Sequence, residues 1–192
     1  KGDVLISGDI TTTGNQSYDA GVTLDGETDL RGESLSLNGV NGGDNEFIIG
    51  FNTTTAINSN WTNIRDFTAQ SAVSLTGSFW TAQSFFDEKV TLLGDTVLTV
   101  GLSGPTTASL LFAGTIDGSH DLSVNTTGPA NVQFNKAVGS TAPLRSLTLA
   151  SAAAVEALES LTIDGTGGSG PGLRFGSAVG NINMTAAGSS IS

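Results

Sequence analysis

His120 is the only histidine of the chain, so catalysis by a serine, a histidine and an acid would have to use it. Its sequence neighbours Asp117, Ser119 and Asp121 supply the other residue types of such a triad. Residues this close together on a turn cannot generally point at one another as a triad requires. We therefore interpret His120 as part of a solvated turn, and we predict no catalytic residue and no enzymatic activity.

Paired carboxylates would allow a second kind of chemistry, the cleavage of a polysaccharide. Two groups of acids have a suitable spacing: Asp25, Glu27 and Asp29 in one segment, and Asp87, Glu88 and Asp95 in a related one. Enzymes that act on acidic sugars also need basic residues to hold the substrate. The chain has only seven Lys and Arg residues, and none clusters beside these acids. A polysaccharide lyase or glycosidase is therefore the alternative function.

Calcium is a further possibility, because carboxylates and turn carbonyls are its usual ligands. Asp44 and Glu46 lie in the segment 41–47, which is similar to one half of a glycine-rich calcium-binding nonapeptide, and Asp164 begins the glycine-rich loop 164–168. Neither segment is repeated in register, which favours acidic turns without a metal. Asp44, Glu46 and Asp164 are kept as weak calcium candidates, and no other cofactor is expected.

The composition indicates strands and turns as the elements that position these residues. Of 192 residues 26 are glycine, only 13% are charged and only 6% are aromatic. The polar positions are filled by Thr, Ser and Asn, whereas helices draw on Glu, Lys, Arg and Gln for their solvent-exposed faces. The chain also lacks cysteine, which excludes disulfides and thiolate metal sites.

The charge balance excludes several partners. With 18 acidic and 7 basic residues the chain carries a formal charge of -11 and a pI of about 4.1, so attraction to nucleic acid or to anionic lipid is disfavoured. No apolar run approaches the roughly 18 residues that span a bilayer, so membrane insertion is not expected.

Short apolar triplets with a polar centre recur about every ten residues, and glycine, asparagine or aspartate separates them. Examples are Val22-Thr23-Leu24, Val90-Thr91-Leu92 and Leu147-Thr148-Leu149. Segment 22–30 resembles segment 90–98, segment 132–139 resembles 173–180, and segment 115–118 resembles 162–165. Degenerate internal repetition of this kind favours a stack of strands over a sandwich.

These observations predict an all-β chain in which residues 1–192 form a single β-solenoid segment of a larger protein. At roughly 20 residues per coil it would make about nine coils and extend on the order of 40 Å. The aromatic-rich section of about 44–86 departs from the pattern and is expected to be irregular or inserted.

The segments 118–128 and 132–148 resemble the repeat of filamentous-haemagglutinin-like exoproteins and giant autotransporter adhesins. The motifs that carry the resemblance are Asp121-Leu122-Ser123-Val124-Asn125, Phe134-Asn135-Lys136-Ala137-Val138-Gly139 and Pro143-Leu144-Arg145-Ser146-Leu147-Thr148. The resemblance covers about two thirds of the chain. It implies a right-handed parallel β-helix, passage through an outer membrane and service as a stalk or adhesive shaft.

The resemblance also implies where such a protein acts. A secreted or bacterial cell-surface segment would contact a component of the host, of a neighbouring cell or of the extracellular matrix. Open strand edges at the ends of a stack would in addition permit self-association end to end or sideways, and so filament formation.

Overall fold

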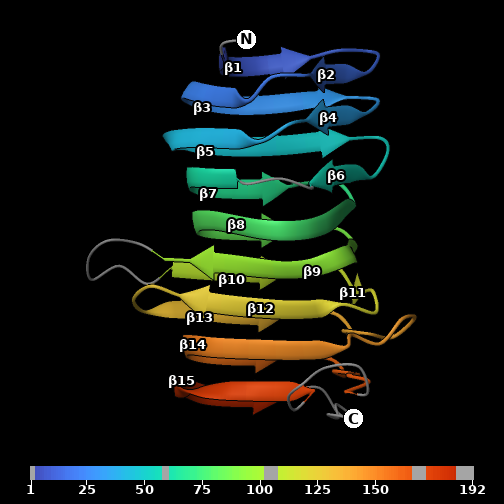
Figure 1. Ribbon diagram of the computed structural model, residues 1–192, viewed down its shortest axis with the longest axis vertical. Coiled ribbons are helices and arrows are strands. Elements are labelled where there is room, and N and C mark those ends of the chain that lie inside the picture. Colours follow the sequence, from blue (N-terminus) through green and yellow to red (C-terminus); the bar gives the residue numbers. More distant parts are fainter. Residues whose placement is uncertain (1–2, 58–60, 102–107, 166–171, 185–192) are drawn as a thin grey trace.

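The computed structural model describes residues 3–57, 61–101, 108–165 and 172–184, and these ranges form strands and turns with no helix (Figure 1). The all-β prediction is therefore confirmed. The strands are β1 (Val4–Thr11), β2 (Gln16–Tyr18), β3 (Val22–Gly32), β4 (Leu35–Leu37), β5 (Val40–Phe51), β6 (Thr55–Ile57), β7 (Trp61–Ala69), β8 (Val73–Phe86), β9 (Val90–Val100), β10 (Ala108–Phe112), β11 (Ile116–Asp117), β12 (Asp121–Thr126), β13 (Ala130–Phe134), β14 (Ser146–Ala157) and β15 (Leu173–Met184). They lie in layers along the long axis, with β1 at one end and β15 at the other.

Alternation of apolar and polar residues explains the strands. In β3 the side chains of Val22, Leu24 and Leu30 are buried, and the residues between them are exposed or half-buried except for Thr28, which is buried as well. The first ten residues of β9 repeat this burial pattern, with Thr96 as the buried threonine. In both strands a threonine hydroxyl donates to a carbonyl two residues earlier: Thr28 to Gly26 and Thr96 to Gly94, each at 3.0 Å. The related segments 22–30 and 90–98 therefore fold in the same way.

All the strand pairs described are parallel, and they close into a ring in the middle of the molecule. β8 pairs with β9 through its first part and with β10 through its end, while β14 pairs with β12 and then with β13. Since β9 also pairs with β12 and β10 with β13, six strands form a closed parallel barrel. In the described residues the whole sheet has 13 strands, and those outside the barrel extend the sheet from it.

The prediction of a right-handed parallel β-helix with roughly 20 residues per coil is wrong, because this barrel closes on itself. The physical reason lies in β8 and β14. Both strands are long enough to turn a corner, so each is hydrogen-bonded on two sides of the molecule at once. Apolar triplets alone did not reveal that one strand continues through a corner.

Side-chain hydroxyls occupy the corners of these two long strands. At the corner of β8 the hydroxyl oxygens of Thr81 and Ser84 lie 2.6 Å apart, and both residues are buried. At the corner of β14 the Ser151 hydroxyl donates to the Thr126 carbonyl at 3.0 Å and accepts from the Thr126 backbone N–H at 3.1 Å. The corners thus keep their polar groups hydrogen-bonded where the strand ladder is interrupted.

Two rows of side chains in register, called column A and column B, run from β1 to β15. Column A contains Val4, Val22, Val40, Trp61, Phe79, Leu98, Val124, Leu149 and Phe175. Column B contains Ile10, Leu30, Ile49, Ala69, Phe86, Phe112, Phe134, Ala157 and Met184. Both columns form much of the hydrophobic core, and they are apolar at every layer.

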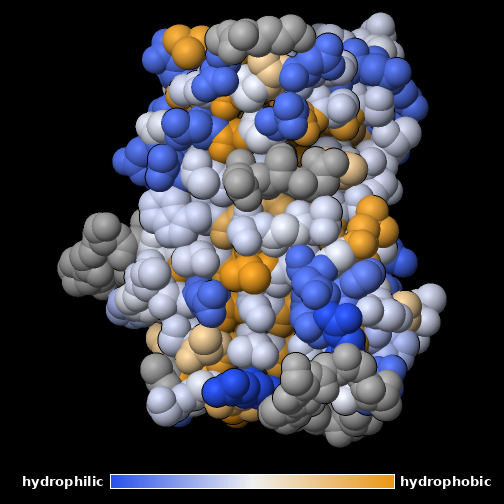
Figure 2. All heavy atoms as spheres, in the orientation of Figure 1, coloured by the Kyte–Doolittle hydropathy of each residue, from blue (hydrophilic) through white to orange (hydrophobic). Residues whose placement is uncertain are grey.

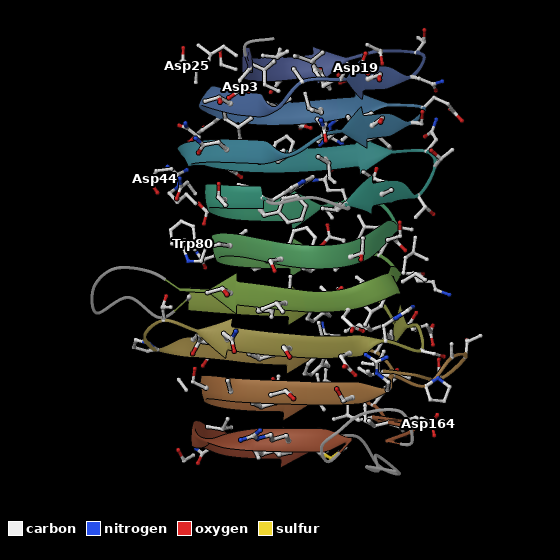
Figure 3. The ribbon with its side chains drawn as sticks, in the orientation of Figure 1. Asp3, Asp19, Asp25, Asp44, Trp80 and Asp164 are labelled. Carbon is white, nitrogen blue, oxygen red and sulfur yellow. The ribbon has the colours of Figure 1, made fainter. Side chains whose placement is uncertain are left out.

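The aromatic-rich section of about 44–86 contributes β6, β7, β8 and most of β5 to the stack. The rings of Phe47, Trp61 and Phe67 pack against one another with centroids 5.3 to 6.1 Å apart, and all three are buried. Trp80, by contrast, is 38% exposed and points to the outside of β8 (Figure 3). One tryptophan of this section is therefore part of the core and the other is part of the surface.

Candidate functional site

Arg145 forms the centre of an ion-pair cluster that joins three neighbouring strands. It directly precedes β14, and its guanidinium donates from Nε to Asp121 Oδ1 at 2.8 Å and from Nη2 to Asp121 Oδ2 at 2.6 Å. The same Nη2 donates to Asp95 Oδ1 of β9 at 2.6 Å. The Ser146 hydroxyl donates to Asp121 Oδ1 at 2.7 Å. We call Asp95, Asp121, Arg145 and Ser146 the Arg145 cluster.

The two sides of this cluster stabilise each other's charge. The hydrogen bonds from Arg145 lower the pKa of Asp121 below its ordinary value, and the Ser146 hydroxyl lowers it further. The hydrogen bonds to Asp121 and Asp95 in turn raise the pKa of Arg145. A fork of donors facing a carboxylate is a strong and directional form of ion pair. Asp121 and Arg145 therefore both remain ionised at neutral pH.

His120 lies beside this cluster but is not arranged as a catalytic base. Its Nδ1 lies 3.7 Å from Asp95 Oδ1, which is longer than a hydrogen bond. Among the described residues no serine or threonine hydroxyl donates to the imidazole, and the nearby Ser146 hydroxyl is bonded to Asp121 instead. A nucleophile with its base in reach is the geometric requirement for triad chemistry.

Asp117 is the most buried carboxylate of this region, with 3% of its surface exposed. Its Oδ1 accepts from the backbone N–H of Thr141 at 2.8 Å and of Ala142 at 3.2 Å, and its Oδ2 lies 3.5 Å from Lys89 Nζ. Gly118 follows with a φ of 131°, and a Cβ there would collide with the backbone of Leu92. Asp117 thus fixes the loop 139–145 to the layer that contains β9 and β11.

A second group of acids lines a recess of about 130 Å³ on the outer side of β1, β3 and β5. Its lining contains four carboxylates, those of Asp9, Glu27, Asp29 and Glu46. We call this feature the acidic recess. Asp9 and Asp29 are direct partners across the strand pair, so their like charges oppose each other.

Two arginines partly neutralise the acidic recess. Arg31 donates from Nε and Nη2 to Asp29 Oδ2 at 3.0 and 2.8 Å, while Arg65 donates to Glu27 at 3.2 Å. Hydrogen bonds from Arg65 to Asp66 and to Glu27 raise the pKa of the Arg65 guanidinium. Asp29 Oδ1 is buried and has no hydrogen-bond partner among the described residues. The recess thus has an excess of negative charge and one unsatisfied oxygen.

The acids that suggested polysaccharide cleavage divide among three places. Glu27 and Asp29 line the acidic recess, and Asp95 belongs to the Arg145 cluster. Asp25, Asp87 and Glu88 are exposed and lie outside both groups. The recess also contains Asp9, which the sequence reading did not single out. Asp9 is the register partner of Asp29 across β1 and β3, so it could have been identified only if this strand pairing had been known.

The calcium candidates do not lie together (Figure 3). Asp44 and Asp164 are on opposite sides and in distant layers of the molecule, while Glu46 faces the acidic recess. Asp44 has a φ of 65°, in the left-handed region that a turn uses. Residues 166–168 of the second loop lie outside the described residues. In the described ranges no group of three or more His, Cys, Asp or Glu side chains is arranged to hold a metal ion.

Comparisons with known proteins give no match: no protein-family model, no curated protein and no solved structure is similar enough to this chain. In the described ranges no helix is long and apolar enough to cross a membrane. The resemblance to filamentous-haemagglutinin-like repeats therefore stays a prediction, and function has to be argued from the geometry.

Proposed function

We propose that the chain is a structural and adhesive segment of a bacterial exoprotein, secreted or held at the cell surface. The observation that carries the proposal is the unbroken pair of columns A and B, which build a continuous stack of parallel strands. Such a stack has strand-backed outer faces on which side chains stand at regular intervals. In a protein of this construction the length of the stack serves the structural role, and the side chains on the outer faces serve the adhesive role.

The outer faces have a composition suited to contact with polar surfaces. Figure 2 shows one face in which polar and weakly polar side chains cover most of the described surface, with smaller hydrophobic patches visible among them. The basic residues described, apart from Arg174, are engaged in ion pairs with acids of the same molecule. The net charge of -11 keeps such a surface soluble and disfavours nucleic acid as a partner.

Exposed apolar side chains provide candidate contact points within this polar surface. Trp80 is 38% exposed, and Leu93 and Leu5 are 62% and 63% exposed. Exposed tryptophan in particular supplies a large contact area at a low entropy cost in recognition. A host, neighbouring-cell or matrix component with apolar and polar groups on its surface is the partner that fits.

Adhesion of coated beads tests the proposal. Beads that carry the purified chain should be retained on at least one of a panel of immobilised collagen, fibronectin, glycans and cell monolayers. Trp80→Ala should reduce retention several-fold, because it removes an exposed anchor without touching the core. Beads coated with an unrelated acidic protein are the control. Retention equal to the control on every surface would contradict the proposed function.

A polysaccharide-cleaving enzyme is the second candidate, and the acidic recess is the observation that favours it. Glycosidic cleavage requires a pair of carboxyl groups, which the recess supplies, and Arg65 beside Glu27 is a basic group of the kind that holds an acidic sugar. If this candidate holds, a panel of acidic and neutral polysaccharides should include one that the chain cleaves. Asp29→Asn should then abolish cleavage, while Glu88→Gln, outside the recess, should leave it unchanged. Absence of cleavage across the panel would remove this candidate.

A further inference from the structure

We propose that copies of this chain stack end to end, with β15 of one copy adding in parallel to β1 of the next. This inference rests on the proposed structural role and names the partner as a second copy of the chain. It is carried by the strand edges, the column ends and the charges at the two ends of the stack.

Both end strands have a free side within the described part of the chain. β1 pairs only with β3, and β15 pairs only with β14. A parallel strand at an edge presents backbone N–H and C=O groups that are ready to pair with another strand. The two edges face opposite ways along the stack (Figure 1). The contact would therefore join different surfaces of two copies, so that it continues without closing.

The ends of the columns are incompletely covered. Val4, at the β1 end of column A, is 36% exposed, whereas Val22 in the next layer is 1% exposed. At the other end Phe175 and Met184, which end the two columns, are half-buried. Ile182, two residues before Met184 in the row beside column B, is 47% exposed, whereas its partner Val155 in β14 is 1% exposed. Val155 and Ile182 also line an open cavity of about 520 Å³. One more layer of strands at either end would bury this apolar surface.

Continuing the columns across the junction sets the register. Phe175 would lie on Val4 of the next copy in column A, and Met184 would lie on Ile10 in column B. More residues separate the two columns in β15 than in β1. A similar difference between β1 and β3 is accommodated by a bulge between Ile6 and Gly8. The junction between β15 and β1 of the next copy would contain a bulge of the same kind.

This register brings opposite charges together. Arg174 precedes Phe175 and Asp3 precedes Val4, so the guanidinium of one copy would face the carboxylate of the next. Asn183 would likewise face Asp9 and could donate to it. Among the described basic residues only Arg174 has no acidic partner in its own molecule; the others are Arg31, Arg65, Lys89, Lys136 and Arg145.

Sedimentation velocity over a range of concentrations, with electron microscopy of the same samples, tests the stacking. The chain should form concentration-dependent oligomers that are one stack wide and grow along the long axis. Arg174→Asp and Asp3→Arg should each weaken association by about tenfold or more, because each places like charges at the junction. The double variant Asp3→Arg with Arg174→Asp restores opposite charges and should recover most of the association.

Glu88→Lys, a charge reversal at an exposed position between β8 and β9, is the matched control and should assemble like the parent chain. Thermal unfolding of each variant shows whether it is folded. A monomer at all concentrations would overturn the inference. The edges of β1 and β15 would then pair with another part of a longer chain or with another partner. Side-by-side sheets, or a double variant no better than the single ones, would overturn it as well.

The inference and the proposed function fail separately. A chain that stays monomeric but holds beads to a surface would refute the stacking and keep the adhesive role. A chain that forms axial filaments but binds none of the surfaces would refute the adhesive role and keep the stacking.

Discussion

At the residue scale, ion pairs connect the layers of the stack. Arg145 reaches Asp95, which lies 50 residues earlier in the chain, and Arg65 reaches Glu27, which lies 38 residues earlier. Exposed ion pairs contribute little one by one, whereas forked pairs that share partners contribute more. The Arg145 cluster, in which Arg145 and Asp121 are half-buried and Asp95 is exposed, is the arrangement of this kind that most directly links neighbouring strands.

Removing the charge of Asp121 should make stability less dependent on pH. The Arg145 hydrogen bonds lower the pKa of Asp121 in the folded chain, so its contribution to stability is present above the unfolded value of about 4. That contribution is lost as the pH falls through the folded value. Asp121→Asn should lower the melting temperature by about 2–4 °C at neutral pH, and the difference from the parent chain should shrink progressively as the pH falls below about 4.

Circular dichroism during heating at several pH values between about 3 and 7 measures this effect. Asp25→Asn is the matched control, because Asp25 is exposed and lies outside both acid groups. A destabilisation by Asp121→Asn that stays constant over the whole pH range would show that shape, not charge, matters at this position.

At the element scale, stacked rings join the layers of the closed barrel. Phe86 and Phe112 lie face to face with centroids 5.0 Å apart, and Phe112 and Phe134 follow at 5.5 Å. These three residues come from β8, β10 and β13, which pair in that order. The same three strands form one side of the barrel, so the ring stack and the hydrogen-bond ladder support each other.

Phe112→Ala should be among the most destabilising single changes in the chain. It opens a cavity in the middle of the ring stack and removes both face-to-face contacts, at a cost of about 3–5 kcal/mol. Leu93→Ala, on the exposed side of β9, should change the free energy of unfolding by less than about 0.5 kcal/mol. Urea denaturation measures both. Similar midpoints for the two variants would show that the stack does not contribute to stability.

At the scale of the whole molecule, the closed barrel and the ends should differ in stability. β9 and β12 each pair on both sides, whereas β1 and β15 have one neighbour each in the described ranges. Amide hydrogen exchange should therefore be at least about tenfold slower in β9, β12 and β13 than in β1 and β15. Uniform protection along the chain would contradict this, and selective slowing of β1 and β15 at high concentration would support end-to-end stacking.

The acidic recess and the Arg145 cluster illustrate what could be predicted about the site. The sequence singled out Glu27, Asp29, Asp95 and Asp121 by residue type and spacing. It did not indicate that Asp9 lies opposite Asp29, or that Arg145 approaches Asp95, because these neighbours depend on the register of parallel strands. Register in turn depends on bulges, such as the one between Ile6 and Gly8, that local residue preferences do not specify.

The internal repeats show the same limit. Segments 22–30 and 90–98 fold alike, but Val132 and Leu173, which begin the second pair of related segments, pair with different parts of β14. Likewise Ile116 bridges to Val138, whereas Ile163 of the third pair bridges to Leu144. Similar short sequences satisfy the same local alternation and still occupy different places in the stack.

The sequence by itself determined the all-β class, because a two-residue alternation of apolar and polar side chains, separated by glycine and asparagine turns, has no stable alternative as a helix. Only the tertiary structure decided that β8 and β14 turn corners and close six strands into a barrel. The reason is that closure depends on which distant strands satisfy the backbone hydrogen bonds on both sides of a bend. That choice is made by the packing of the whole core and not by any short segment.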